Sequence, residues 1–337
     1  MRWAVQGACP QARAARRSPY NPVMTTRTRG TDALRERLLS ALSANRAARL
    51  NFPGVFMNLT GGRESPDTLD LRCEELDFLY TRRGEWHLPV IGVIADIALG
   101  GVTRLLFGHT HRPATVQLDL AFTGKPLRGP LTARSHCHGL SSDTALHHAI
   151  ATGVVKAGDE VVAHASGGFV LLALPPGSTQ NTDPWLQGSI ADAPALAEAA
   201  LSEDEQAVLA RYLKAQARGR RNASFVEQFW CGVPRRGDGR ASLTVEVGPH
   251  LGNRVGQVHG GILLGLAADV ANAAVPDELR LAKLSSCYLS PGQGPRLKVR
   301  AGVVQRSRNL AVVRTEIFNA DGTRVLETTS QHIRKAG

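Results

Sequence analysis

The chain has 337 residues, of which 43% are hydrophobic, and its formal net charge is +11 at pH 7. This composition excludes collagen-like, coiled-coil and disordered classes, and the length allows about two domains. The excess of basic residues favours a polyanionic partner, either nucleic acid or a phosphorylated cofactor. We expect no membrane span, because we find no apolar run of the roughly 18–20 residues that a membrane helix needs.

The first half of the chain begins with residues 1–29, which contain Arg but no acid and predict a disordered basic tail. Leucines at helical spacing predict a helix over 31–50, and short strands follow in 51–86. Residues 88–106 are apolar on nearly every side, which is typical of a buried helix. The strands predicted after it are Ala114–Phe122, Pro130–His138 with an extension through His147–Ala149, and Glu160–Leu174, with Gly153 as punctuation.

A linker is predicted over residues 175–222, in which Ser202 and Glu205 have the spacing of a capping box before a helix. The pattern of the first half then returns. A strand at Ala241–Val247 precedes a second apolar helix at Gly260–Val275. Four strands follow it, at Arg280–Leu289, Arg296–Arg306, Ala311–Asn319 and Val325–Ile333, with a hairpin turn at Asn319–Gly322.

The five cysteines form no CxxC pair, and their number is odd, which argues against a disulfide framework or a structural zinc site. They are Cys9, Cys73, Cys137, Cys231 and Cys287. We therefore expect a reducing compartment and a cytoplasmic protein. His136 and His138 share a strand face, but the histidines lack acidic or Cys neighbours at ligand spacing on one helix face, so we predict no metal.

Each half thus contains leading strands, one buried helix and several antiparallel strands. This organisation predicts an α+β fold of two tandem domains, 30–174 and 223–337, each an antiparallel sheet wrapped round a helix. The first helix follows His87 and carries Asp96, whereas the second follows His259-Gly260-Gly261 and carries Asp269. Many of the residues in both helices are small, which lets a sheet close tightly round them.

A strand, a turn, His-Gly-Gly, a buried helix with an Asp and an antiparallel meander resemble the hotdog-fold acyl-CoA thioesterases, particularly the phenylacetyl-CoA type. The resemblance covers roughly 50–174 and 223–335. It implies two hotdog units forming an internal pseudo-dimer, and an acyl-CoA substrate that brings coenzyme A with it, with no separate cofactor. Nucleic acid is disfavoured, because aromatic residues make up only 5% of the chain and do not interleave with basic ones. Further assembly of such chains into a homo-oligomer is left open.

In that family one unit supplies an Asn, a His and a Gly N–H, and the opposite unit supplies an acid nine residues after its own His. Asn253, His259 and Gly260 match the first set, and Asp96 matches the acid. In the second half the corresponding position is Ala268, and Asp269 comes one residue late, about 100° further round the helix. The resemblance therefore implies one complete composite site, with Asp269 as the alternative acid, and a degraded mirror site of Thr81, His87, Leu88 and Ala268.

A helix N-terminus can receive the negative charge that develops on a thioester oxygen, and Asp96 can serve either as general base or as nucleophile. The resemblance also implies that Arg306 and Arg308, at a turn between strands, meet the phosphates of coenzyme A. Two alternatives stay open, a non-catalytic acyl-CoA-binding or regulatory protein and, with less support, a double-hotdog enoyl-CoA hydratase.

Overall fold

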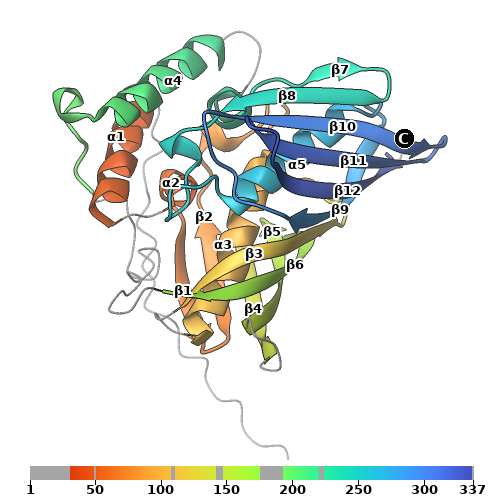
Figure 1. Ribbon diagram of the computed structural model, residues 1–337, viewed down its shortest axis with the longest axis horizontal. Helices are drawn as coiled ribbons and strands as arrows, with labels where there is room; N and C mark the ends of the chain where they lie inside the picture. The colour runs from red at the N-terminus through yellow and green to blue at the C-terminus, as the bar shows by residue number, and fades with distance from the viewer. Residues whose placement is uncertain are drawn as a thin grey trace, which may run out of the picture.

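A computed structural model describes residues 31–48, 51–107, 111–141, 147–174, 193–219 and 224–335, so the predicted tail lies outside the described residues. One twelve-stranded antiparallel sheet runs through the molecule (Figure 1). The first unit consists of α1 (Thr31–Ala48), α2 (Phe52–Phe56), β1 (Thr60–Ser65), β2 (Thr68–Cys73), η1 (Asp77–Leu79), α3 (Leu88–Phe107), β3 (His111–Phe122), β4 (Leu131–Ser141), β5 (His147–Ala157) and β6 (Glu160–Ala173).

Three short elements connect the two units, and the second unit then repeats the topology of the first. The connecting elements are η4 (Glu198–Ala200), α4 (Glu203–Gly219) and the π-helical turn η5 (Glu227–Cys231). The second unit consists of β7 (Arg235–Gly237), β8 (Arg240–Glu246), η6 (Pro249–Leu251), α5 (Gly260–Ala273), β9 (Leu279–Tyr288), β10 (Arg296–Arg306), β11 (Leu310–Asn319) and β12 (Arg324–Arg334).

The strand order confirms the predicted repeat. Outward from β3 the strands are β6, β5, β4, β2 and β1, and outward from β9 they are β12, β11, β10, β8 and β7. The two units therefore have one topology, and they join where β3 pairs antiparallel with β9, from Gln117 opposite Cys287 to Ala121 opposite Lys283. This pairing makes the two sheets continuous.

The core helices α3 and α5 pack against each other at backbone distance. A Cβ atom on Gly265 would lie 2.2 Å from the Cα of Pro89, and one on Gly261 would lie 2.3 Å from the carbonyl oxygen of Gly92. Real Cβ atoms do not approach other atoms so closely, so these glycines let the helices meet without intervening side chains. The small residues in both helices allow the two helices to approach each other closely, in addition to allowing the sheet to pack against them.

The predicted extension of the second strand through His147–Ala149 is wrong. These residues begin the separate strand β5, which pairs antiparallel with both β4 and β6. Gly153, which we predicted to separate two strands, lies inside β5. A Cβ atom there would come within 2.6 Å of the Arg134 carbonyl oxygen on β4. The glycine there allows close approach of two strands rather than ending one.

The expectation that no apolar run reaches membrane length is also corrected. Helix α3 has 20 residues, and its mean hydropathy of 1.9 would suit a membrane span by length and composition. The two charges that seemed to interrupt the run, Asp96 and Arg104, are both buried. Helix α3 is covered by α5 and by the strands of the first unit, so that 78% of the apolar stretch of α3 is buried. The apolar surface of α3 therefore forms the core of the first unit.

Helices α1 and α4 lie side by side at the edge of the molecule (Figure 1). Arg46 of α1 donates from Nε to Glu205 Oε1 of α4 over 3.1 Å. Glu205 also closes the predicted capping box: Oε2 accepts from the Ser202 backbone N at 2.8 Å, and the Glu205 N donates to Ser202 Oγ at 3.4 Å. The capping box is therefore confirmed, and it positions the carboxylate that ties the two helices together.

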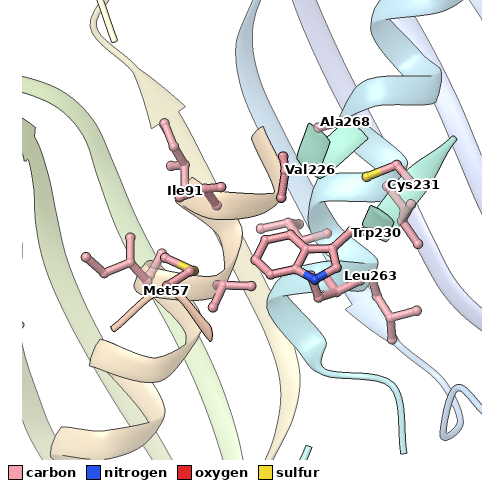
Figure 2. Close-up of a cluster of buried hydrophobic side chains, with 14 of the residues drawn as sticks. Met57, Ile91, Val226, Trp230, Cys231, Leu263 and Ala268 are labelled. Atoms are coloured by element: carbon pink, nitrogen blue, oxygen red, sulfur yellow. The ribbon is translucent and has the colours of Figure 1, made fainter. Parts of the chain in front are cut away.

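Apolar side chains fill the space between the first turns of the two core helices. Figure 2 shows Trp230 and Cys231 of η5 beside Leu263 of α5, facing Met57 and Ile91 of the first unit. Trp230 and Met57 are fully buried, and Cys231 is 1% exposed. The short turn η5 thus connects both units to a single core, and it places a thiol in the interior.

His332 on β12 gives the fold a predictable response to acid. The side chain is fully buried, and burial lowers its pKa to about 4. Because an unfolded His has a pKa of about 6.5, the unfolded chain binds more protons below that pH, and stability falls progressively as the pH drops towards 4. We expect the stability that urea unfolding measures to fall by about 2–3 kcal/mol less between about pH 7 and pH 4.5 in His332→Gln than in the unaltered protein. An equal loss in both proteins would contradict this assignment.

Candidate active site between the two units

Asp96 of α3 contacts the N-terminus of α5 across the interface between the units. Its carboxylate is buried, with the residue 7% exposed, and Oδ2 accepts a hydrogen bond from the Gly261 backbone N over 2.8 Å. The other oxygen, Oδ1, accepts from Thr115 Oγ1 of β3 over 3.0 Å. The first unit therefore supplies an acid and a hydroxyl that positions it, and the second supplies a helix N-terminus.

His259 is the N-cap of α5, with extended backbone angles and a side chain turned back over the first turn. Its Nδ1 accepts from the Gly261 N over 3.1 Å and lies 3.3 Å from Asp96 Oδ2. Burial lowers the pKa of His259, and the nearby charge of Asp96 opposes that shift only in part. The imidazole is therefore held neutral, and its lone pair caps the helix.

Gly260 faces the carboxylate directly. A Cβ atom at this position would lie 2.7 Å from Asp96 Oδ2, so any side chain would displace the acid. The Tyr288 hydroxyl of β9 donates to the Gly260 carbonyl oxygen over 2.8 Å, and burial raises the pKa of this phenol so that it keeps its proton. The family resemblance implies the Gly260 N–H as the donor to the thioester oxygen, and the neighbouring N–H of Gly261 binds Asp96.

Asn253 shapes the turn that leads into the helix. Its Oδ1 accepts from the backbone N of Val255 and of Gln257, each over 3.0 Å, and its own N donates to the Gln257 carbonyl over 2.7 Å. These contacts give Asn253 a role in orienting the turn before the helix. The side chain fixes the loop from which His259 emerges.

A cavity of about 360 Å³ opens in front of Asp96. Apolar residues of both units line one part of it, including Ile97 and Phe169 of the first unit and Leu263 of the second. Its basic lining residues among those described are Arg104, Arg112 and Arg254. Burial, and then the charge of Arg254, lower the pKa of Arg104 to about 9, so these two cations lie close enough to repel each other.

Arg306 and Arg308 lie away from this cavity. The lining residues Pro291 and Gly292 precede β10, whereas Arg306 ends that strand of 11 residues, about 35 Å away at ~3.3 Å per residue. The Arg308 carbonyl accepts from Arg334 Nε over 3.0 Å. Sequence reasoning could not find Arg104, Arg112 and Arg254 instead, because only the fold brings a helix, a strand and a loop together.

The prediction that Ala268 occupies the mirror position is wrong. Asp269 reaches it, with Oδ2 3.5 Å from His87 Nδ1. The helix contacts keep the spacing of the two histidines, because Gly265 packs against Pro89 and Gly261 packs against Val93. Asp269 therefore faces His87 from one residue beyond the position that matches Asp96.

The mirror site still differs from the first in one essential group. Pro89 stands at the position that corresponds to Gly261 and has no backbone N–H. The acid at the mirror site therefore has no helix donor equivalent to the one that Asp96 contacts. Of the two positions, only the one with Asp96 combines a carboxylate with a donating helix N-terminus.

Comparisons with known proteins agree with this architecture. Residues 250–332, which include α5 and its His-Gly-Gly motif, match a family described as the acyl-CoA thioesterase N-terminal domain. No curated protein matches the sequence. A conserved protein of unknown function with a hot dog fold from Alicyclobacillus acidocaldarius is 12% identical, with a TM-score of 0.50 over 82% of this chain and 96% of that chain.

Two further solved structures are similar. The tesB protein of Mycobacterium avium subspecies paratuberculosis is 13% identical, with a TM-score of 0.48 over 82% of this chain and 96% of that chain. A Bacillus halodurans protein crystallised with CoA is 22% identical, with a TM-score of 0.36 over 41% of this chain and 97% of that chain. Together with the repeated strand order, the Alicyclobacillus match identifies the fold: the chain consists of two tandem hotdog units, and residues 250–332 of the second unit match the acyl-CoA thioesterase domain model.

Proposed function

We propose that this protein hydrolyses an acyl-CoA thioester to the free acid and coenzyme A at one composite site between its two units. The observation that carries the proposal is the contact of 2.8 Å between Asp96 Oδ2 and the Gly261 N–H. A carboxylate and a helix N-terminus at this distance can act on the carbon and the oxygen of one carbonyl group. The family match of the second unit supports the same chemistry.

In the proposed reaction the thioester oxygen takes the place of the carboxylate at the N-terminus of α5. The unpaired N–H groups there and the helix dipole stabilise the negative charge that grows on this oxygen. With Asp96 as general base, the water oxygen bonds to the acyl carbon as the C–S bond breaks, and Asp96 passes the proton that it takes from the water to the departing thiolate of coenzyme A. With Asp96 as nucleophile, its own oxygen forms the bond to the acyl carbon, and water then cleaves the resulting anhydride and supplies the proton for the thiolate. Thr115 and His259, which contact the carboxylate and the first turn, hold these groups in place.

The cavity supports binding of such a substrate. Its apolar wall, with Ile97, Phe169 and Leu263, suits an acyl group. Arg104, Arg112 and Arg254 supply the positive charge that the phosphates of coenzyme A require, the role first considered for Arg306 and Arg308. No separate cofactor is needed, because the thioester brings coenzyme A with it.

The direct test is a hydrolysis screen of the purified protein with short, long and aromatic acyl-CoAs, in which a thiol-reactive dye reports the coenzyme A released. We expect hydrolysis of at least one class, abolished in Asp96→Asn. Binding of an acyl-CoA without release of the thiol from any of them would select the non-catalytic alternative.

The role of Asp96 can be decided by a single turnover in water enriched in ¹⁸O. If Asp96 acts as general base, the label enters the product acid directly. If Asp96 attacks the carbonyl as nucleophile, an anhydride forms, and water that opens it at the Asp96 carbonyl leaves the label in the protein. Label found by mass spectrometry in the peptide that contains Asp96 establishes the nucleophilic route, because water attack at the acyl carbon of the anhydride would, like the base route, label only the product.

Thr115→Val should lower kcat about 10-fold with little change in KM, because the hydroxyl orients Asp96 and the other residues that line the cavity are unchanged. Val has nearly the shape of Thr, so the packing of β3 is kept. The matched control is Thr103→Val, which removes a buried hydroxyl of α3 that bonds to the Leu99 carbonyl. Equal losses of kcat in the two variants would show that Thr115 acts only through stability.

A further inference from the structure

We propose that His87, Cys231 and Asp269 form a Zn²⁺ site at the mirror position between the units. One ligand atom from each residue lies within 4.8 Å of the others. The three residues come from the segment before α3, from η5 and from α5, so they are far apart in the chain and converge only in the fold. Sequence spacing therefore gave no indication of this site.

The geometry suits a tetrahedral ion. With bonds of about 2.0–2.3 Å, neighbouring ligand atoms of tetrahedral zinc lie roughly 3.3–3.8 Å apart. His87 Nδ1 and Asp269 Oδ2 are 3.5 Å apart, which is long for a hydrogen bond and matches two ligands of one metal. The Cys231 sulfur lies within 4.8 Å of the ligand atoms of both residues.

A second observation points to a ligand here. His87 is 5% exposed, and its Nδ1 is buried without a hydrogen-bond partner among the described residues. Buried polar atoms are nearly always paired, and an orphaned one calls for an explanation. A metal ion bound to this nitrogen supplies the missing partner.

The donor set selects the metal. A thiolate, an imidazole and a carboxylate together are typical ligands of zinc. The Cys231 thiol releases its proton when the ion binds. Glu227, on the same turn as Cys231, lies near enough to act electrostatically on Cys231 and on Asp269, and its negative charge favours a cation at the site.

The site would have an exchangeable position. Three protein ligands leave one corner of the tetrahedron for water or a small anion. His87 and Asp269 also line a cavity of about 790 Å³, which shares no lining residue with the cavity in front of Asp96. Basic residues lie in the lining of this second cavity, among them Arg82 and Arg236, and they would draw an anion to the open position.

The experiment uses the full-length protein, freed of metal by dialysis against a chelator and titrated with Co²⁺, which occupies tetrahedral zinc sites and reports a thiolate ligand by its charge-transfer absorption. We expect this absorption to saturate at one equivalent and to disappear when Zn²⁺ displaces the cobalt. Cys231→Ser should abolish it. His87→Gln and Asp269→Asn should weaken Zn²⁺ binding at least about 10-fold, since even outer partners of a metal contribute that much.

Cys137→Ser is the matched control, because Cys137 is also buried but lies outside the cluster, and it should keep the full signal. Circular dichroism shows whether each variant is folded. The proposal is overturned if the unaltered protein gives no saturable charge-transfer band, which requires no variant to fold. It is also overturned if a folded Cys231→Ser keeps the band, or if Cys137→Ser loses it.

Discussion

Asp96→Asn is expected to lower kcat for acyl-CoA hydrolysis by about 100-fold or more, the usual loss when a positioned base or nucleophile is removed. Asn has the same shape as Asp and can still accept the Gly261 N–H, so the contact between the units should be kept. Its side chain has no negative charge, and it can neither take a proton from water nor attack a thioester. Steady-state kinetics measures the loss, and the melting temperature shows whether the fold is intact.

The same measurement on Asp269→Asn distinguishes the two acids. Asp269 faces His87 in the mirror position and not the cavity in front of Gly260. If Asp269→Asn abolished hydrolysis while Asp96→Asn retained it, the alternative acid would be the catalytic one, and the composite site proposed here would be wrong. If both variants retained hydrolysis, neither the Asp96 nor the Asp269 carboxylate would take part in the reaction.

Gly265→Ala is expected to destabilise the protein by about 3 kcal/mol or more, at the upper end of what overpacking a core usually costs. The new methyl group would lie 2.2 Å from the Pro89 Cα, a backbone atom that cannot move without shifting α3. Helix propensity alone predicts the opposite, a gain of up to about 1 kcal/mol for Gly to Ala. Urea unfolding decides which effect dominates.

Gly100→Ala is the matched control for this prediction. Gly100 also lies inside a core helix, but a Cβ atom there would be 3.4 Å from Phe169 Cε1, an ordinary contact with a side chain. This variant should be neutral or slightly stabilised. Equal effects of the two substitutions would mean that the contact between α3 and α5 does not depend on Gly265.

Much of the fold could be predicted because local and repeated patterns determine it. The apolar helices, the capping box at Ser202 and the hairpin turn at Gly322 each depend on neighbouring residues, and the structure contains all three. The separate strand β5 was missed because a glycine in a strand and a glycine in a turn look alike in sequence. What distinguishes Gly153 is its approach to β4, which is a contact between strands.

The residues of the candidate site also fall into two groups, those that local sequence patterns predict and those that only the fold brings together. Asp96 and His259 follow from spacing along two helices that resemble known ones, and the structure brings them within 3.3 Å of each other. Thr115 and Tyr288 come from strands whose register no local pattern reports. Asp269 was placed in the wrong direction because a count from the histidine gives a position on the helix but not how far the side chain reaches in the fold, where Asp269 lies 3.5 Å from His87.

The two sheets join through β3 and β9 within one polypeptide, so a substitution in one unit is not repeated in the other. In an assembly of identical subunits every substitution appears at both symmetric positions, so losing a helix donor at one would lose it at the other. Here Pro89 stands in one half and Gly261 in the other. Covalent linkage thus permits a division of labour, in which one interface position carries the proposed acyl chemistry and its twin the proposed metal ion.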